Sequence, residues 1–314
     1  MAASQCGADT TSFESVEFPF GHAALQGSIG WVYVTEQHAR ALSPALLWAG
    51  KNEIISLNVL TETDADVLAR RAQLFDSDIS IWGVANGRVT RAAASGPLPS
   101  VKVRDTHEQF ALMIETSGAD VVREHGLLTG EVLGLEVCRV VNDDAGDGAR
   151  LEIGVGAHDR ETFQLVHGRD ATVESLARVA GIVRDHRNEG SVPHPLNRLA
   201  PERLLRHRIV ASPELIGAAH LQPVEPPVRR MNVKDEMPCV ALGTLANGTP
   251  VVVVCTASID VDVVAFGADA RLRAAPDAEL FIATHANNVT PSLHKLAQSL
   301  RNPARFVEVC PVRR

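Results

Sequence analysis

The sequence has few aromatic residues and no long apolar run. Phe, Trp and Tyr together make up 4% of its 314 residues. The longest apolar segments, such as residues 250–255, have the length of a strand and fall far short of the roughly 18 residues that suggest a membrane-spanning helix. We therefore expect no integral membrane segment. The scarcity of aromatic side chains also disfavours binding of single-stranded nucleic acid by base stacking.

Several familiar motifs are also missing. The sequence contains no GxxxxGK[ST], no GxGxxG after a predicted strand, no GxSxG and no CxxC pair. P-loop NTPases, ordinary dinucleotide oxidoreductases and α/β-hydrolases are thus disfavoured. Four of the five cysteines lie in apolar, strand-like segments, so we expect reduced, structural thiols. The N-terminal residues lack the basic and apolar regions of a secretory signal, which favours a cytoplasmic protein.

Composition and charge are those of a globular protein. Hydrophobic residues account for 45% and charged residues for 22% of a chain long enough for two domains. The net charge of −8 disfavours a surface that binds nucleic acid all over. Charge is uneven, however, because residues 184–234 hold nine Lys and Arg against five Asp and Glu. A local anionic partner therefore remains open.

Periodicity and turn residues predict an α/β fold. We expect a flexible N-terminus at residues 1–20, a mixed-sheet main domain at 21–228 with helices on both faces, and a smaller α/β domain at 238–314. "PPVRRMNVKDEMP", residues 226–238, is the predicted linker. The Asn86-Gly87 and Asn247-Gly248 pairs predict hairpins, because both turn positions favour positive φ. Thr172 and Thr290 are predicted helix caps, and Thr106 with Gln109 has the spacing of a capping box.

Acidic residues interrupt the apolar stretch "GADVVREHGLLTGEVLGLEVCRVV", residues 118–141. We expect two strands here, joined by a turn near residues 126–130. With a third strand after residue 149, the order over 106–224 is helix, three strands, helix, strand. Carboxylates at this spacing could hold a divalent cation for phosphodiester hydrolysis. The alternative is that these acids are charged strand ends.

That element order and those acids resemble the core of the PD-(D/E)XK nuclease superfamily. The resemblance implies that Asp120 is the family's Asp at the second core strand and that Glu136 is the Glu of its Glu-x-Lys motif. Glu131 is an additional acid. The sequence departs from the motif at the Lys position, which is Cys138. Strand alternation places Arg139 on the face opposite Glu136, so we do not expect Arg139 to replace the Lys.

The stretch "GVGAHDRETFQLVHG", residues 154–168, is a second candidate site. If the strand continues through it, alternation places Glu152, Gly154, Gly156 and His158 on one face, with bare backbone beside His158. His158 would then be a general acid or base, since imidazole titrates near neutral pH. In the alternative, the glycines mark a bulge and "HDRE" begins a helix.

The basic segment "HPLNRLAPERLLRHR", residues 194–208, is the third candidate. Arg203 and Arg206 share a face of a helix that begins at Pro201, and His194 and Arg198 precede it, so the group could bind a phosphate. Alternatively, the arginines pair with Glu202 and with acids from the first half of the chain.

The C-terminal region offers two weaker candidates. Asp260, Asp262 and Asp269 surround one predicted helix, and we expect a cap and surface acids there, with a bound cation as the alternative. Ser258 could be an exposed nucleophile, but no His can be assigned to it from sequence.

The first functional hypothesis is a metal-dependent hydrolase of a phosphate ester, with nucleic acid among the candidate substrates. Asp120 and Glu136 would bind Mg²⁺ or Mn²⁺, and Glu131 or Glu152 would assist. His158 would be the general base or acid. The phosphate would be held by His194, Arg198, Arg203 and Arg206. The alternative is a non-catalytic binding or regulatory protein that keeps such a core and recognises an anionic ligand or partner. The sequence leaves the oligomeric state open.

Overall fold

The structure is a computed structural model that describes residues 2–7, 13–143, 148–167, 171–188, 190–229 and 236–310. Its strands form sheets of six, four and five strands, and the predicted α/β class is confirmed. The chain divides into two compact units. Unit 1 contains residues 1–97, 259–282 and 287–306, and unit 2 contains residues 98–258, 283–286 and 307–314.

These units do not follow the expected domains. The predicted main domain at 21–228 is shared by both units, and so is the predicted C-terminal domain at 238–314. The reason is that residues 259–282 belong to the same unit as the N-terminal elements. Of the predicted linker at 226–238, residues 230–235 lie outside the described part of the chain.

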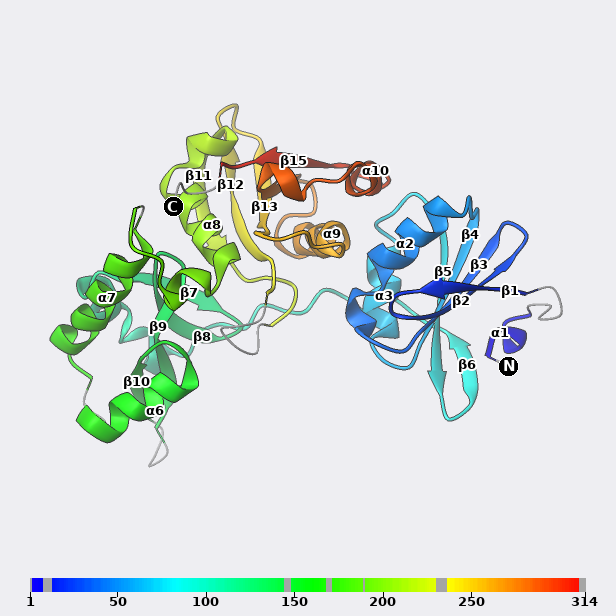
Figure 1. The fold of residues 1–314 in the computed structure, drawn as a ribbon. Helices are drawn as coiled ribbons and strands as arrows, with labels where there is room; N and C mark the ends of the chain where they lie inside the picture. Colours follow the sequence, from blue (N-terminus) through cyan, green and yellow to red (C-terminus); the bar gives the residue numbers. More distant parts are fainter. Residues whose placement is uncertain are drawn as a thin grey trace. The chain divides into compact units, whose positions relative to one another are not determined.

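Unit 1 is built on the six-stranded sheet, with strand order β1-β2-β3-β4-β5-β6. The strands β3, β4 and β5 are parallel, and the other pairs are antiparallel. Figure 1 shows α2 and α3 beside this sheet. The elements lying wholly in unit 1 are α1 (Ala2–Gln5), β1 (Glu14–Phe18), β2 (Gly21–Gln26), β3 (Ile29–Val34), η2 (His38–Arg40), α2 (Leu42–Lys51), β4 (Ser56–Thr61), α3 (Ala65–Ala72), β5 (Asp78–Ala85), β6 (Arg88–Arg91), α9 (Val263–Ala274) and α10 (Pro291–Gln298).

Most of the local structure predicted for unit 1 is confirmed. The Asn86-Gly87 hairpin is confirmed, with φ of 50° and 73° at the turn between β5 and β6. Thr290 caps α10 by accepting the amide of Leu293. The expected flexible N-terminus is wrong for residues 14–18, which pair with β2 as β1. Phe18 in this strand is buried in the core and only 6% exposed. The polar composition of the first 20 residues does not reveal this contact.

A buried ion-pair network joins α3 to α9. Arg70 donates to both oxygens of Asp269, and Arg71 donates to Asp269 and to Asp262 at 3.2 Å. Asp260 pairs with Arg40 at 2.6 Å. Burial, the larger effect, raises the pKa of Asp262 to about 7 even though the charge of Arg71 opposes it. The expectation of a cap and surface acids is therefore wrong, because all three aspartates are buried and paired.

Unit 2 holds an antiparallel sheet with strand order β10-β9-β8-β7. Figure 1 shows α7 and α6 beside it. The elements lying wholly in unit 2 are α4 (Asp105–Glu108), α5 (Ala111–Thr116), β7 (Asp120–Glu124), β8 (Leu127–Val132), β9 (Leu135–Asn142), β10 (Ala149–Ile153), α6 (Gly156–His167), α7 (Val173–Arg187), η3 (Pro195–Arg198), α8 (Pro201–Ala211), η4 (Pro213–Ile216), β11 (Ala218–Val224), β12 (Cys239–Leu245) and β13 (Pro250–Cys255).

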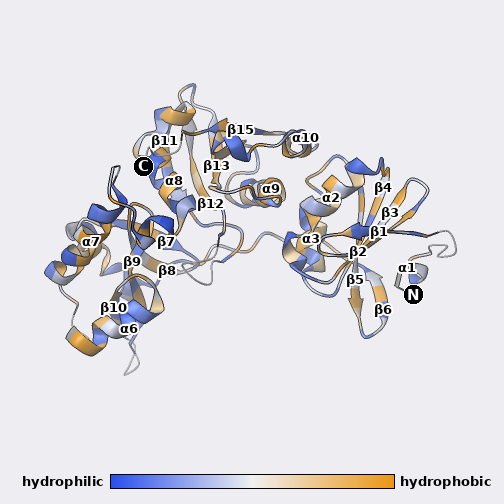
Figure 2. Cartoon of the chain, in the orientation of Figure 1, coloured by the Kyte–Doolittle hydropathy of each residue, from blue (hydrophilic) through white to orange (hydrophobic). Residues whose placement is uncertain are grey.

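The third sheet comprises β11 to β15. The strands β11, β12 and β13 form antiparallel pairs in unit 2, and the Asn247-Gly248 hairpin between β12 and β13 is confirmed. The strands β14 (Glu279–Thr284) and β15 (Ala304–Glu308) each contribute residues to both units. In Figure 2, β13 is orange because four consecutive valines make it hydrophobic on both faces.

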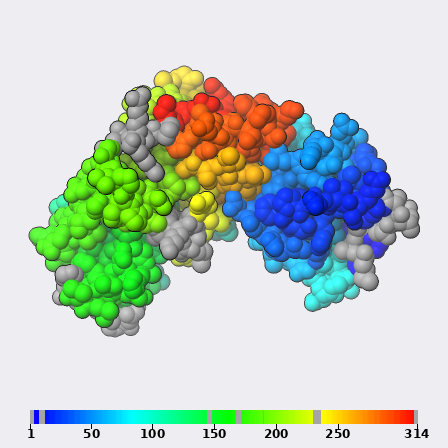
Figure 3. Space-filling model, in the orientation of Figure 1, coloured from blue at the N-terminus to red at the C-terminus, as the bar shows by residue number. Residues whose placement is uncertain are grey.

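The core of unit 2 lies between the four-stranded sheet and its helices. Ile114 of α5, Val140 of β9 and Leu176 of α7 are each fully buried in one cluster. Thr172 begins α7 with a capping box that includes Ser175, as its sequence predicts for the cap. The segment of α6 and α7, coloured green in Figure 3, forms part of the visible surface. No helix in the described residues is long and apolar enough to cross a membrane.

Two local predictions fail in unit 2. The capping box at Thr106 and Gln109 is wrong, since α4 has Arg104 as its N-cap without a side-chain bond and a second helix, α5, begins at Ala111. The two strands expected over 118–141 are three strands, because a second turn, at Leu133 and Gly134, separates β8 from β9. Both turns, His125-Gly126 and Leu133-Gly134, have positive φ at each position, and only the first was anticipated.

The turn between β8 and β9 packs against the backbone of α8. At Gly134, φ is +73°, and a Cβ there would lie 2.3 Å from the carbonyl carbon of Arg203. α8 begins with Pro201 at its first position, as predicted, which suits the fixed φ of proline. The absent side chain at residue 134 thus lets α8 approach this edge of the sheet.

We predict that Gly134→Ala destabilises unit 2 by about 2–4 kcal/mol, since it adds left-handed strain and an overlap with α8. Gly217→Ala is the matched control, because Gly217 has the same φ of +73° and nothing within 4 Å of the added Cβ. Its cost should be the backbone strain alone, about 1–2 kcal/mol. Urea unfolding of the full chain measures both, and equal losses in the two variants would contradict the close packing of α8.

Candidate functional site

The predicted metal ligands lie in one row across the four-stranded sheet of unit 2. Asp120 on β7 is opposite Glu131 on β8, and Glu131 is opposite Glu136 on β9. Directly opposed residues share a face of a sheet. The tertiary structure therefore brings the three acids to one face, as the sequence hypothesis requires, and the question becomes which groups surround each of them.

A β-bulge decides which side chains of β9 join this face. Gly130 of β8 pairs with Cys138 of β9, but the next residue, Glu131, pairs with Glu136. Val137 is thus an additional residue of β9 that has no partner on β8. Val137 and Cys138 are consequently both buried in the core, at 0% exposure. Glu136 and Arg139 share the other face, where Arg139 donates two hydrogen bonds of 3.0 Å to Glu136. The expectation that strand alternation separates these two residues is wrong.

The bulge also places Cys138 away from the acids. Its sulfur lies on the core side, next to Gly130, where an added Cβ would be only 2.5 Å away from it. Burial, the largest effect, raises the pKa of the Cys138 thiol to about 12. Cys138 therefore offers neither a positive charge nor a thiolate at the position where the resemblance requires Lys.

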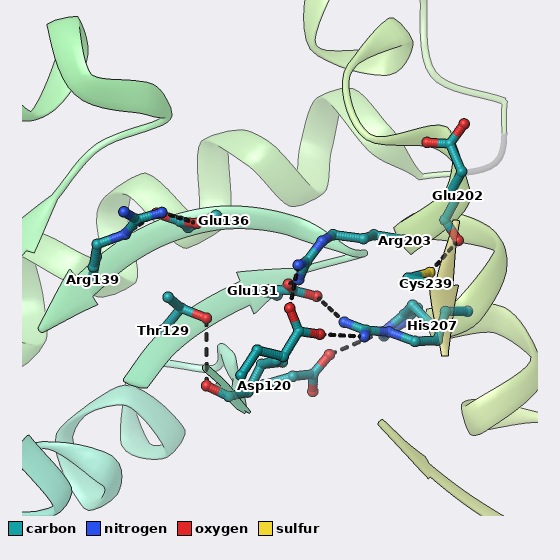
Figure 4. Close-up of polar contacts among 12 residues, drawn as sticks. Asp120, Thr129, Glu131, Glu136, Arg139, Glu202, Arg203, His207 and Cys239 are labelled. Atoms are coloured by element: carbon teal, nitrogen blue, oxygen red, sulfur yellow. Dashed lines mark hydrogen bonds and ion pairs between the residues drawn. The ribbon is translucent and has the colours of Figure 1, made fainter. Parts of the chain in front are cut away.

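Two arginines of α8 neutralise the centre of the acidic row. Arg203 donates to Glu124 and to Glu131, and Arg206 donates to Glu124 at 2.6 Å and to Glu131 at 3.2 Å. We call these four residues the Arg-Glu tetrad. Its side chains are 2% to 11% exposed. Figure 4 shows Glu131 facing Arg203, whereas Glu136 lies beside Arg139.

Electrostatics holds the tetrad in its charged form. Burial alone would raise the pKa of Glu124, but the guanidinium groups of Arg203 and Arg206 outweigh burial and lower that pKa to about 2. The same carboxylates raise the pKa of both arginines against the effect of burial. Arg203 and Arg206 share a helix face as predicted, yet each is already engaged by two acids. The part of the alternative in which they pair with acids from the first half of the chain is therefore confirmed, whereas the expected pairing with Glu202 stays a prediction.

The outer acids of the row also have partners. Glu136 accepts from Arg160 at 3.2 Å in addition to Arg139, and Glu152 accepts from Arg150 at 3.0 Å. Asp120 lies at the rim, 60% exposed, with Nδ1 of His207 at 2.9 Å. No group of three His, Cys, Asp or Glu side chains that could hold a metal ion occurs within the described ranges. The Mg²⁺ or Mn²⁺ site stays a prediction, and it would require these carboxylates to exchange guanidinium partners for a metal.

His158 does not lie beside bare strand backbone. β10 ends at Ile153, and Gly156 begins α6, so the alternation predicted for Glu152, Gly156 and His158 is wrong. The alternative is confirmed in that "HDRE" is helical, but the helix begins two residues earlier, at Gly156. Gly154, at φ +142°, instead allows the strand to turn closely against the backbone of Arg160. His158 is exposed on α6, and it is Arg160 and Gln164 of that helix that contact Glu136 and Glu152.

His194 and Arg198 lie apart from the tetrad. His194 stacks on His186 with ring centroids 3.9 Å apart, and its Nδ1 accepts the amide of Leu196 as the cap of η3. Arg198 is exposed at the end of η3. Both border a shallow hollow that also includes Asn197. The predicted four-residue phosphate site is thus divided, with two members buried in ion pairs and two at another surface.

A cavity of about 480 Å³ lies on the other side of α8. It is at the carboxyl ends of strands, because Thr256, just after β13, donates its amide to Ala283 of β14, and Val309, just after β15, donates to Thr284. Ligands of α/β proteins commonly bind outside the carboxyl ends of strands. The polar residues that line the cavity are Arg187, Asn188, Ser191, Asn197, Glu202, Arg208, Glu236, Ser258 and His285.

Three of these side chains have free bonding capacity at the cavity. Asn197 has a buried Oδ1 without a hydrogen-bond partner. Arg208 uses Nη1 to donate to the carbonyl of Cys310 at 2.8 Å. His285 has Nδ1 3.0 Å from the carbonyl oxygen of Val309, so Nδ1 donates to it, and in the neutral ring Nε2 is then an acceptor. A ligand can therefore find both donors and acceptors in one cavity.

Arg187 is a largely buried cation among the residues that line the cavity. Its guanidinium donates to the carbonyls of Leu133, Leu196 and Leu199, which are dipoles and not carboxylates. Burial, the largest effect, lowers the pKa of Arg187 to about 10, so the group remains charged at neutral pH. It also fixes the residues between α7 and α8 that form one side of the cavity.

Sequence reasoning missed this site, except for Ser258. His285 and Ser258 each follow a strongly apolar strand, and the rule that ligands bind at carboxyl ends of strands could have paired them. Arg208 was in the basic segment but outside the chosen helix face. Comparison with known proteins adds nothing to this geometry, since no family model, curated protein or solved structure matches the chain.

We predict that Glu131→Gln destabilises unit 2 by about 3–5 kcal/mol, because it leaves Arg203 and Arg206 in a buried site with one carboxylate fewer. Glu108→Gln is the control. It removes one partner of the pair between Glu108 and Arg123, whose side chains are 32% and 47% exposed, and should change stability by less than about 1 kcal/mol. Urea unfolding measures both, and a loss at Glu131 no larger than at Glu108 would show that the tetrad does not hold α8 in place.

Proposed function

We propose that the chain is a binding protein for a small anionic molecule that occupies the cavity beside α8. The observation that carries the proposal is that one cavity is lined by Arg208, by His285 and by Asn197, whose buried Oδ1 has no hydrogen-bond partner. Its volume of about 480 Å³ is in the range typical of small-molecule sites. This is the non-catalytic alternative of the sequence hypotheses, with the ligand placed at a different face of the basic segment.

The charges favour an anion of limited size. Arg208 keeps N–H groups beyond the one given to Cys310 and could bind a carboxylate or phosphate in bidentate fashion. Arg187 adds a buried positive charge. Glu202 and Glu236 also border the cavity and would repel a polyanion. A monoanion or dianion fits this balance better than a nucleic acid backbone does.

The acceptors favour a ligand that also donates hydrogen bonds. Nε2 of His285 and Oδ1 of Asn197 both need an N–H or O–H partner. A hydroxy acid or a sugar phosphate supplies an anionic group for Arg208 and hydroxyl donors for these two acceptors. A simple dicarboxylate supplies only the first. Malate and succinate, which differ by one hydroxyl group, therefore form a matched pair of probes.

The nuclease-like core and its hydrolase activity stay predictions. The resemblance rested on three strands between helices and a fourth strand after them. In the structure four strands precede α6, and β11 belongs to another sheet. The carboxylates that the hydrolase needs are those of the acidic row, which are paired with arginines and His207. No contact of these carboxylates favours the hydrolase over ligand binding.

We predict that malate and inorganic phosphate raise the thermal unfolding midpoint of the full chain, and that malate does so at lower concentration than succinate. A ligand at 100 times its Kd stabilises the folded state by about 2.7 kcal/mol. Arg208→Gln should weaken binding about 10- to 100-fold, since a charge-assisted bond is lost. Arg178→Gln, exposed on α7 and outside the cavity, is the control. Equal weakening in both variants, or no shift with any probe, would refute the proposal.

We also predict that Mg²⁺ and Mn²⁺ leave the unfolding midpoint unchanged, because guanidinium groups occupy the carboxylates of the acidic row. The measurement is a thermal-shift titration of the wild type and of the double variant Asp120→Ala, Glu136→Ala. A metal-dependent rise in the wild type that disappears in the double variant would support the hydrolase instead.

A further inference from the structure

Two of the five cysteines face each other across β12 and β13. Cys239 is the first residue of β12, Cys255 is the last residue of β13, and the register places them directly opposite. They are 2% and 0% exposed. We call them the cysteine rung. Within the described residues all cysteines are free thiols.

The geometry of the rung is compatible with a disulfide. The amide of Leu245 donates to the carbonyl of Thr249, which makes these two residues a hydrogen-bonded pair of the hairpin. Pairs alternate along an antiparallel ladder, and six steps further Cys239 and Cys255 are again a hydrogen-bonded pair, with Cα atoms about 5.5 Å apart. Disulfides span Cα distances of about 4.4–6.8 Å. The Cα separation expected for the rung therefore lies within the range that a disulfide spans.

The rung is linked to three residues that line the cavity beside α8. Sγ of Cys239 donates to the carbonyl of Glu202, in the first turn of α8, at 3.2 Å (Figure 4). Glu236 precedes Cys239 by three residues, and Ser258 follows Cys255 by three. Glu202, Glu236 and Ser258 all line the cavity. A change in the rung would therefore act on three segments of its wall.

We propose that Cys239 and Cys255 form a reversible disulfide with a low-molecular-weight disulfide as oxidant, and that this disulfide changes ligand affinity in the neighbouring cavity. The second half of the proposal rests on the proposed function, whereas the first half does not. The bond fixes the separation of the chain segments that lead to Glu236 and Ser258. It also removes the S–H that Cys239 donates to Glu202, and the first turn of α8 loses this anchor.

The chemistry is thiol–disulfide exchange and balances without a further reagent. One thiol of the rung loses its proton and attacks glutathione disulfide, which forms a mixed disulfide and releases one glutathione thiolate. The second sulfur attacks the mixed disulfide, closes the bond between Cys239 and Cys255, and releases the second glutathione. The rung is oxidised by two electrons, and glutathione disulfide is reduced to two glutathione molecules that carry the two protons.

Access to the rung comes from its place at the open end of the hairpin. The pair is the last one of the ladder, at the end opposite the Asn247-Gly248 turn, and terminal pairs open more readily than central ones. Burial, the largest effect, and the neighbouring Cys239 raise the pKa of the Cys255 thiol. Because the thiolate is the attacking species, oxidation should accelerate as pH rises.

The test uses the full chain with Cys6→Ser and Cys310→Ser, which removes the two cysteines that lie outside the core. The protein is equilibrated with glutathione disulfide at pH 8, blocked with a maleimide under denaturing conditions, digested and analysed by mass spectrometry. We expect a peptide pair linked through Cys239 and Cys255 that disappears on treatment with dithiothreitol. Cys138 is the internal control, because it is buried in the other sheet of unit 2 without a cysteine neighbour and should remain a thiol.

The same samples then test the cavity. The Kd for malate, measured by thermal shift, should differ about fivefold or more between reduced and oxidised protein. In Cys255→Ser, oxidant should leave this Kd unchanged. Free thiols at both Cys239 and Cys255 after treatment with oxidant, or glutathione attached without a linked peptide, would refute the disulfide. A linked peptide together with an unchanged Kd for malate would refute the effect of the disulfide on the cavity. A linked peptide with no malate binding in either redox state would refute the proposed function but not the disulfide.

Discussion

The pairing of Arg203 and Arg206 with Glu124 and Glu131 is the interaction on which unit 2 depends. Four charged groups are removed from water together, and each cation contacts both anions. Removing one partner from such a set leaves an uncompensated buried charge, which costs far more than the pair contributes in water. The tetrad therefore specifies how α8 lies against the sheet, and Gly134 permits that approach because it has no side chain.

The position of α8 in turn creates the candidate ligand site. One face of the helix carries Arg203 and Arg206 toward the sheet, and another carries Arg208 toward the cavity. The first turn of α8 accepts a hydrogen bond from Cys239, which connects the helix to the cysteine rung. Charge neutralisation on one side of the helix and recognition on the other thus use the same basic segment. A small anion at the cavity would meet arginine that the acidic row has not already neutralised.

Unit 1 uses the same device with different elements. Arg70 and Arg71 of α3 hold Asp269 and Asp262 of α9 across almost 200 residues of sequence. Such pairs explain why residues 259–282 belong with the N-terminal sheet and not with the segment that precedes them. In both units, then, buried arginines neutralise buried acids that lie far from them in the sequence.

Sequence by itself determined the local features of this protein. Asn86-Gly87 and Asn247-Gly248 make hairpins, Thr172 and Thr290 begin helices, and the four valines of β13 make a buried strand, because each depends on neighbouring residues only. Tertiary structure alone decided the partners of the charged residues. The bulge at Val137 reversed the expected face of Arg139, and of the predicted site acids Glu136 pairs with Arg160 of α6 and Glu131 with Arg206 of α8. The alternation of side chains along a strand reverses after one extra residue. A charged side chain pairs with an opposite charge that the fold brings within about 4 Å, and sequence periodicity does not predict that partner.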